Sequence, residues 1–118
     1  MFHHSKIRDE AVERALTNQA ARLIVSHCIR APRSAKALSE VTRLPLASTY
    51  RHIHNLVGDD ILVVERSALT EDGKPFDLYR SRVRFARIEL MAERVVVGWE
   101  ANEAIEDRIK SMWDFIGR

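Results

Sequence analysis

The sequence has few of the residues that hold small proteins together without a hydrophobic core. Its 118 residues include one cysteine, Cys28, which excludes an intramolecular disulfide. Only 4 glycines and 3 prolines are present, so collagen-like and linker-like structures are excluded as well. No segment has the roughly 18 consecutive apolar residues of a membrane-spanning helix. The hydrophobic share of 46% is sufficient for one core, and we expect a single domain over residues 1–118.

The first ten residues also lack the apolar run of a secretory signal, since they carry two histidines and mixed charges. We therefore expect a cytoplasmic protein that does not bind membranes. The net charge is only +2, but it is distributed in blocks. Residues 20–58 hold six basic residues against Glu40, and residues 74–88 hold five against Asp77. These two segments could form one positive surface, although ordinary solvated faces would give the same pattern.

Three amphipathic segments occupy the first half of the chain. Apolar residues recur every three or four positions over residues 9–29, which predicts one or two helices. Pro32 ends this pattern, and Ser34 is placed to cap a second helix of about two turns. Pro45 suits the first turn of a third helix, expected over residues 46–57.

The second half begins with a change of period. The β-branched run 61–64 predicts a strand, and the sequence from Glu71 to Pro75 predicts a turn. A strand returning from Phe76 alternates apolar and basic residues until the alternation shifts by one position near Ala86, which predicts either a bulge or a strand buried on both faces. After a turn at 91–94, residues 95–97 predict a further strand, so strands are expected over 61–99. Residues 102–116 then predict a last amphipathic helix.

The order of these elements, together with two sequence segments, resembles the ArsR-like winged helix-turn-helix transcription regulators. Residues 44–56 (LPLASTYRHIHNL) are similar to the recognition-helix segment of such proteins, and residues 34–45 (SAKALSEVTRLP) are similar to the preceding helix. Tyr79-Arg80-Ser81 is similar to the strand that follows the wing, so the resemblance covers roughly residues 20–85. It implies an α+β, mainly helical fold, with a helix-turn-helix at 34–58, a β-hairpin wing at 70–76 and a C-terminal dimerisation helix.

A helical projection of residues 46–57 supports the same function. With Ile53 at the centre of the buried face and about 100° per residue, an inward cluster forms from Leu46, Thr49, Tyr50, Leu56 and Val57. The other side carries short polar and basic side chains that suit base edges in the major groove: Ala47, Ser48, Arg51, His52, His54 and Asn55. Tyr50 is expected in the core with its hydroxyl reaching a phosphate.

Contacts to the DNA backbone are expected at two other places. Arg33, Ser34 and Lys36 lie at the start of the second helix, where the helix dipole favours an anion. Lys74 at the wing tip is expected to reach the backbone or minor groove, with Arg66 as a weaker companion. Arginines of the returning strand serve either DNA binding or the solubility of a sheet face.

The last helix has an apolar face that the rest of the domain does not need. In similar regulators the first and last helices pair across a two-fold axis, which would place two recognition helices about 34 Å apart on a palindromic site. We therefore expect a homodimer whose interface includes Ile105, Ile109, Met112, Trp113 and Ile116. The alternative is that this helix folds back on its own domain.

Metal binding and catalysis find little support. Cys28 has no second cysteine beside it, and His52 and His54 point about 200° apart on a helix, so they cannot share an ion. No phosphate-binding glycine loop or activated nucleophile is evident, so we expect neither an enzyme nor a cofactor. The sequence predicts a dimeric regulator of transcription, a repressor in the first instance, that binds double-stranded DNA. The alternatives are a winged-helix module that docks on transcription-machinery proteins, or a metal or redox sensor. A small-molecule effector is a further candidate partner.

Overall fold

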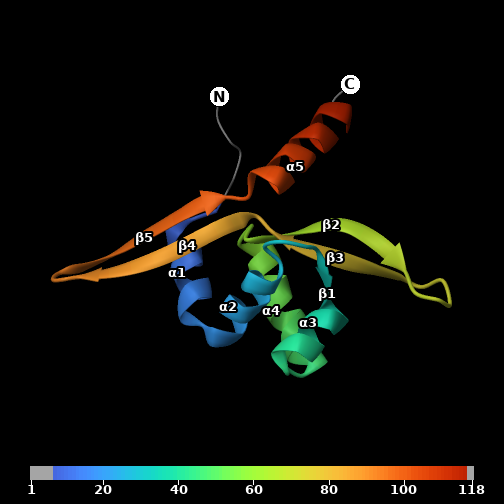
Figure 1. Cartoon of the computed structure of the whole chain (residues 1–118), viewed down its shortest axis with the longest axis horizontal. Coiled ribbons are helices and arrows are strands. Elements are labelled where there is room, and N and C mark those ends of the chain that lie inside the picture. Colours follow the sequence, from blue (N-terminus) through green and yellow to red (C-terminus); the bar gives the residue numbers. More distant parts are fainter. Residues whose placement is uncertain (1–6, 117–118) are drawn as a thin grey trace.

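The computed structural model describes residues 7–116, with side chains placed for residues 7–114. Within that range the protein is an α+β fold that combines five helices with two antiparallel sheets (Figure 1). The helices are α1 (Asp9–Thr17), α2 (Gln19–His27), α3 (Ala35–Thr42), α4 (Leu46–Gly58) and α5 (Glu103–Ile116). The strands are β1 (Arg33–Ser34), β2 (Leu62–Leu69), β3 (Pro75–Ser81), β4 (Val83–Met91) and β5 (Arg94–Ala101).

Side-chain caps and a proline mark the starts of α2, α3 and α4. The amphipathic segment 9–29 is divided at Asn18, whose side chain accepts a hydrogen bond from the backbone N–H of Ala21 (2.9 Å) and starts α2. Ser34 caps α3 in the same way by accepting from the N–H of Ala37 (3.1 Å). α3 ends at Arg43, which has a left-handed φ of 61°, and Pro45 precedes the first turn of α4. Residues 43–45 therefore form a tight turn between α3 and α4.

The strands form two separate hairpins, because the long middle strand expected between the turns at 71–75 and 91–94 is divided into β3 and β4. β1, β3 and β2 make a three-stranded sheet, and β4 pairs only with β5. The continuous strand expected from Phe76 through Ala86 is therefore wrong, because the chain changes sheet between Ser81 and Val83. The buried hydroxyl of Ser81 donates to the carbonyl of Val83 (2.7 Å) and accepts from its N–H (3.0 Å), which fixes the crossing. This crossing, together with an irregular pairing between Val83 and Phe85, causes the shift in the apolar–polar alternation near Ala86.

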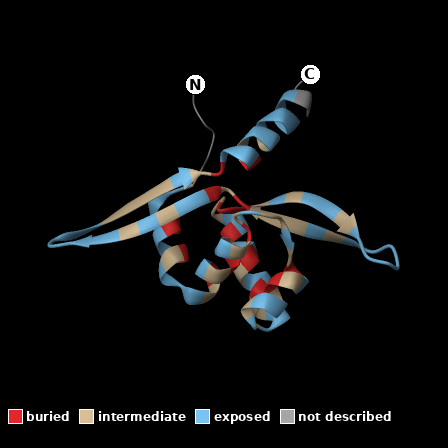
Figure 2. Cartoon of the chain, viewed as in Figure 1, coloured by how far each residue is buried: buried red, intermediate tan, exposed pale blue. Residues whose placement is uncertain are grey.

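The core lies where α1 to α4 meet the inner ends of both hairpins (Figure 2). Ile24, Leu38, Ile61 and Leu62 are among its fully buried side chains. Cys28 is also completely buried, and loss of solvation raises the pKa of its thiol from 9.0 to about 12. Cys28 is therefore a neutral packing residue.

The outer parts of the molecule extend well beyond this core. The hairpins β2–β3 and β4–β5 project in opposite directions, and α5 points away from the other helices (Figure 1). The overall dimensions are 56 × 41 × 20 Å. Most of both hairpins and most of α5 are exposed or half-buried (Figure 2). Among the described helices, none combines the length and apolar character that crossing a membrane requires.

Polar contacts attach α5 to the rest of the fold at its first turn. The Asn102 side-chain amide donates to the carbonyls of Ile29 (3.2 Å) and Ser81 (3.1 Å). The Arg82 guanidinium donates from Nε and Nη2 to the two carboxylate oxygens of Glu106, each at 3.0 Å. Ile105 is buried between these contacts at 2% exposure. The start of α5 is thus anchored to the crossing between the two sheets.

Candidate functional site

The outer face of α4 carries one continuous stripe of exposed side chains. It follows the helical spacing of three and four residues and consists of Ala47, Tyr50, Arg51, His54 and Asn55. α4 contains no acidic residue at all, so Arg51 lies near the centre of the stripe without a carboxylate on its own helix. No acceptor within the described residues hydrogen-bonds to the Arg51 guanidinium. The stripe is therefore a largely polar surface with one positive charge that no carboxylate of α4 balances.

The structure corrects three positions of the helical projection. Leu46, Tyr50 and Val57 were expected to face inward, yet they are exposed, Tyr50 to 51%. The buried face consists of Thr49, Ile53 and Leu56, because α2, α3 and β2 cover only a narrow side of α4. Tyr50 is therefore a surface residue and not a core residue with a polar tip.

Ser48 and His52 lie on the shoulder of α4, where both are half-buried. They flank the exposed stripe on the side opposite Leu46 and contribute less surface than Arg51 or His54. This placement follows from the shift of the buried face away from Leu46 and Tyr50, toward Thr49 and Leu56. The two histidines point away from each other, as their spacing predicts.

The start of α3 brings a second set of the expected residues close to α4. Arg33 and Lys36 are exposed, while Ser34 is half-buried with its hydroxyl committed to capping α3. β1 pairs Arg33 with Tyr79 of β3. Burial raises the pKa of Tyr79, and the nearby Asp77 and Tyr50 raise it further. Tyr79 is not among the site residues that the sequence predicts.

The β2–β3 loop presents less positive charge than expected. Lys74 is exposed, but its ammonium lies 3.9 Å from the carboxylate of Asp72, and Glu71 is adjacent. The Thr70 hydroxyl donates to Asp72 (2.5 Å), and Gly73 turns the chain with φ 83°. Hydrogen bonds from Thr70 and from the backbone lower the pKa of Asp72, so the loop keeps this negative charge. Arg66, the other basic residue expected here, is exposed on β2.

Two arginines of the second basic block are neutralised inside the fold. Arg80 pairs with Glu65 at 2.9 Å, with side-chain exposures of 17% and 5%, and donates to the carbonyl of Ile29 at 3.0 Å. Arg82 pairs with Glu106 and lies 3.7 Å from Asp60. Their positive charge is therefore balanced locally. The sequence could not reveal this, because each partner comes from a distant part of the chain.

The residues expected at a dimer interface divide into two groups. Ile105 is buried within its own chain, so its assignment to an interface is wrong. Ile109 is half-buried, whereas Met112 and Trp113 are 56% and 69% exposed on the projecting part of α5. The side chain of Ile116 lies outside the described residues. The apolar face of α5 is thus open beyond its first turn.

The chain matches no protein-family model, and no curated protein sequence is significantly similar to it. Within the described residues, no group of three or more His, Cys, Asp or Glu side chains is arranged to hold a metal ion.

Proposed function

We propose that this protein binds double-stranded DNA sequence-specifically through a winged helix-turn-helix and acts as a dimeric repressor of transcription. The observation that carries the proposal is the exposed, acid-free stripe of α4 with Arg51 near its centre. In this proposal α3 and α4 are the helix-turn-helix, and the hairpin β2–β3 is the wing. The proposal rests on the resemblance of residues 20–85 to ArsR-like regulators and on the exposed residues of α4.

The proposed division of labour follows the chemistry of the stripe. Arg51 offers paired donors for guanine O6 and N7, and Asn55 can pair with adenine. Ala47 is small enough to let α4 approach a thymine methyl group. Tyr50 and His54 extend from the same face and reach bases or adjacent phosphates. These residues would read sequence from the major groove.

Contacts to phosphate would fix the position of α4 in the groove. Arg33 and Lys36 are exposed at the start of α3, where the helix dipole adds to their attraction for an anion. The wing contributes through Lys74, although Asp72 and Glu71 weaken its field. We therefore expect the affinity of the wing for DNA to be smaller than that of α3 and α4.

Dimerisation would cover two apolar surfaces that the described part of the chain leaves open. One is the outer part of α5 with Met112 and Trp113. The other is one face of β4–β5, where Ala86 pairs with Trp99, Ile88 with Val97, and Leu90 with Val95. Its inner pair packs on the core, whereas Leu90 at the outer end is 85% exposed. A second copy of the chain could cover both surfaces, because every contact across a two-fold axis is made twice.

The test is a selection of duplexes from a random pool by the purified chain, followed by fluorescence anisotropy with the selected and a scrambled duplex at two salt concentrations. We expect a preference of about a hundredfold or more for the selected duplex, with affinity falling as salt rises. Arg51→Ala should weaken the selected site by about 1–3 kcal/mol and leave scrambled DNA nearly unchanged. Arg87→Ala on β4 is the control and should leave both affinities unchanged. Equal losses on both duplexes for Arg51→Ala would refute the assignment of α4 as the reading helix.

A second candidate function is docking on a protein of the transcription machinery. The observation that favours it is the open apolar face of β4–β5, together with the carboxylates at the β2–β3 loop. This function predicts weak binding to all duplexes alike and no enrichment in the selection.

A further inference from the structure

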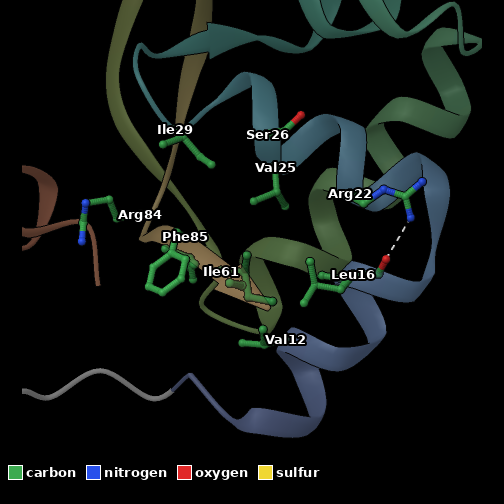
Figure 3. Close-up of a pocket in the computed structure, with 12 residues that line it drawn as sticks. Val12, Leu16, Arg22, Val25, Ser26, Ile29, Ile61, Arg84 and Phe85 are labelled. Atoms are coloured by element: carbon green, nitrogen blue, oxygen red, sulfur yellow. Dashed lines mark hydrogen bonds between the residues drawn. The ribbon is translucent and has the colours of Figure 1, made fainter. Parts of the chain in front are cut away.

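An apolar cleft opens between α1, α2 and the start of β4 (Figure 3). Its volume is about 280 Å³. Its lining includes Leu16 from α1, Val25 from α2, Ile29 just after α2, Ile61, and Phe85 from β4. Figure 3 shows Phe85 and Leu16 on opposite sides of the cleft, with Ile61 between them. The volume is close to the lower limit of about 300 Å³ for small-molecule pockets.

A second concavity of about 700 Å³ adjoins this cleft and is strongly basic. The two share Ser26, Ile29 and Arg84. The remaining residues that line the second concavity are His27, Arg30, Arg33 and Arg80, and none of its described lining residues is acidic. We call this concavity the arginine basin. The apolar cleft and the arginine basin thus form one continuous depression along α2.

The guanidinium groups of the basin differ in how many of their N–H donors already have a hydrogen-bond partner. Arg80 is committed to Glu65 and the carbonyl of Ile29. Arg33 uses only its Nε, which donates to the carbonyl of His27 at 3.2 Å. Arg30 is exposed and has no partner among the described residues. Arg84 pairs with Glu100, but both side chains are more than half exposed, so water weakens this pair. Three guanidinium groups therefore keep donors for an incoming anion.

We propose that the cleft and the arginine basin form one binding site for a small amphipathic anion. A short alkyl chain or a single aromatic ring occupies the cleft between Leu16 and Phe85. A phosphate or carboxylate headgroup receives charge-assisted hydrogen bonds from Arg30 and Arg84, with Arg33 beside them. The small volume of the cleft selects a short chain over a long lipid tail.

The continuity of the two concavities distinguishes this ligand from the alternatives. A DNA phosphate would use the basin and leave the apolar cleft empty. An uncharged apolar molecule would fill the cleft and leave the guanidinium groups without an acceptor. Only a ligand that carries both parts uses both surfaces. This proposal goes beyond DNA binding and does not depend on it, because binding is measured on the protein alone.

The experiment is isothermal titration calorimetry of the full chain with octyl phosphate and with octanoate, at concentrations below micelle formation. Octanol and inorganic phosphate serve as the two halves of the ligand. We expect at least one of the two anions to bind about tenfold or more tightly than either half, as one added charge-assisted contact implies. The stronger of the two anions identifies the headgroup.

Variants locate the site. Arg30→Glu and Arg84→Glu should each weaken binding about tenfold or more, because each replaces an attractive charge with a repulsive one. Arg87→Glu lies on the same strand as Arg84 but does not line either concavity, so it should leave binding unchanged. Ser26→Trp at the border of the two concavities should block binding with the headgroup residues intact. Circular dichroism checks that each variant is folded.

Several results would overturn the proposal. Equal affinity for octyl phosphate and inorganic phosphate would mean that the basin binds any anion and that the cleft is unused. Equal affinity for the anions and octanol would mean that apolar adsorption alone is observed. Loss of binding in Arg87→Glu as large as in Arg30→Glu would place the ligand elsewhere, and absence of binding for both anions would remove the site altogether.

Discussion

Replacing Glu106 with alanine should destabilise the fold strongly, because it leaves a buried guanidinium without its main partner. Arg82 donates to both oxygens of Glu106 at 3.0 Å, and the two side chains are only 13% and 10% exposed. This pair joins the crossing between the two sheets to the first turn of α5. Removal of one member of a buried ion pair costs about 3–5 kcal/mol. Asp60, at 3.7 Å from Arg82, remains as a weaker partner and is itself partly exposed. We therefore expect a loss of about 2–3 kcal/mol in the free energy of unfolding.

The assay is urea denaturation at one protein concentration, followed by the fluorescence of the two tryptophans. A fixed concentration is required because dimerisation would add to the measured stability. Glu103→Ala is the matched control: Glu103 is exposed on the same turn and pairs with no described residue, so the change should stay within about 0.5 kcal/mol. The double variant Arg82→Met/Glu106→Leu removes both charges and should recover most of the loss.

The reasoning is refuted if Glu106→Ala and Glu103→Ala have the same effect. That outcome would show that Arg82 is solvated in the folded protein and that α5 is held by Ile105 and Asn102 without the ion pair. Failure of the double variant to recover stability has a different meaning. It would show that the pair is net stabilising and does more than balance a buried charge.

Three further predictions concern other parts of the chain. Cys28 should resist alkylation in the folded protein and react on unfolding. Burial raises the pKa of Cys28 from 9.0 to about 12, so its ionisation should not affect stability below pH 9. Between pH 9 and about pH 12 the free energy of unfolding should fall by up to about 1.4 kcal/mol per pH unit. Urea denaturation at alkaline pH checks this, with Cys28→Ala as the control. Gly73→Ala should lower the free energy of unfolding by about 1 kcal/mol, because a φ of 83° is strained for alanine. Gly58→Ala, at the end of α4, should be neutral or slightly stabilising in the same denaturation assay, because a Cβ there meets nothing within 4 Å. Met112→Ser/Trp113→Ser should shift the protein to monomer in sedimentation velocity without lowering monomer helicity, and an unchanged mass would remove α5 from the interface.

The helical half of the fold could be predicted from the sequence because its signals are local. The spacing of apolar residues marks the segments, and Ser34 and Pro45 mark where two of the helices begin. Alternation within a strand carries less information, since it defines two faces but not the sheet to which they belong. The chain changes sheet at Arg82 while the alternation of apolar and basic residues continues nearly unbroken, so the second hairpin could not be separated from the first.

The candidate site could be predicted in outline only. A helical projection gives the order of side chains around α4, but the width of its buried face depends on the helices that cover it. α2 and α3 cover a narrow side, and Tyr50 consequently lies outside. The availability of Arg80 and Arg82 likewise depends on tertiary contacts that the sequence does not show. Whether a basic residue is available to a ligand depends on carboxylates brought near by the tertiary fold, here Glu65 and Glu106.

The two proposed sites share Arg33, and this sharing determines how they would influence each other. In the proposed DNA interface Arg33 contacts a phosphate, and the same residue lines the arginine basin. Its Nε donates to the carbonyl of His27, so a headgroup and a DNA phosphate would have to share the donors of its two terminal nitrogens. A headgroup that draws these donors into the basin would therefore oppose their use on DNA. By reciprocity, DNA would lower the affinity for that ligand by the same factor. The coupling passes through one side chain, so the fold need not change shape for the ligand to weaken DNA binding.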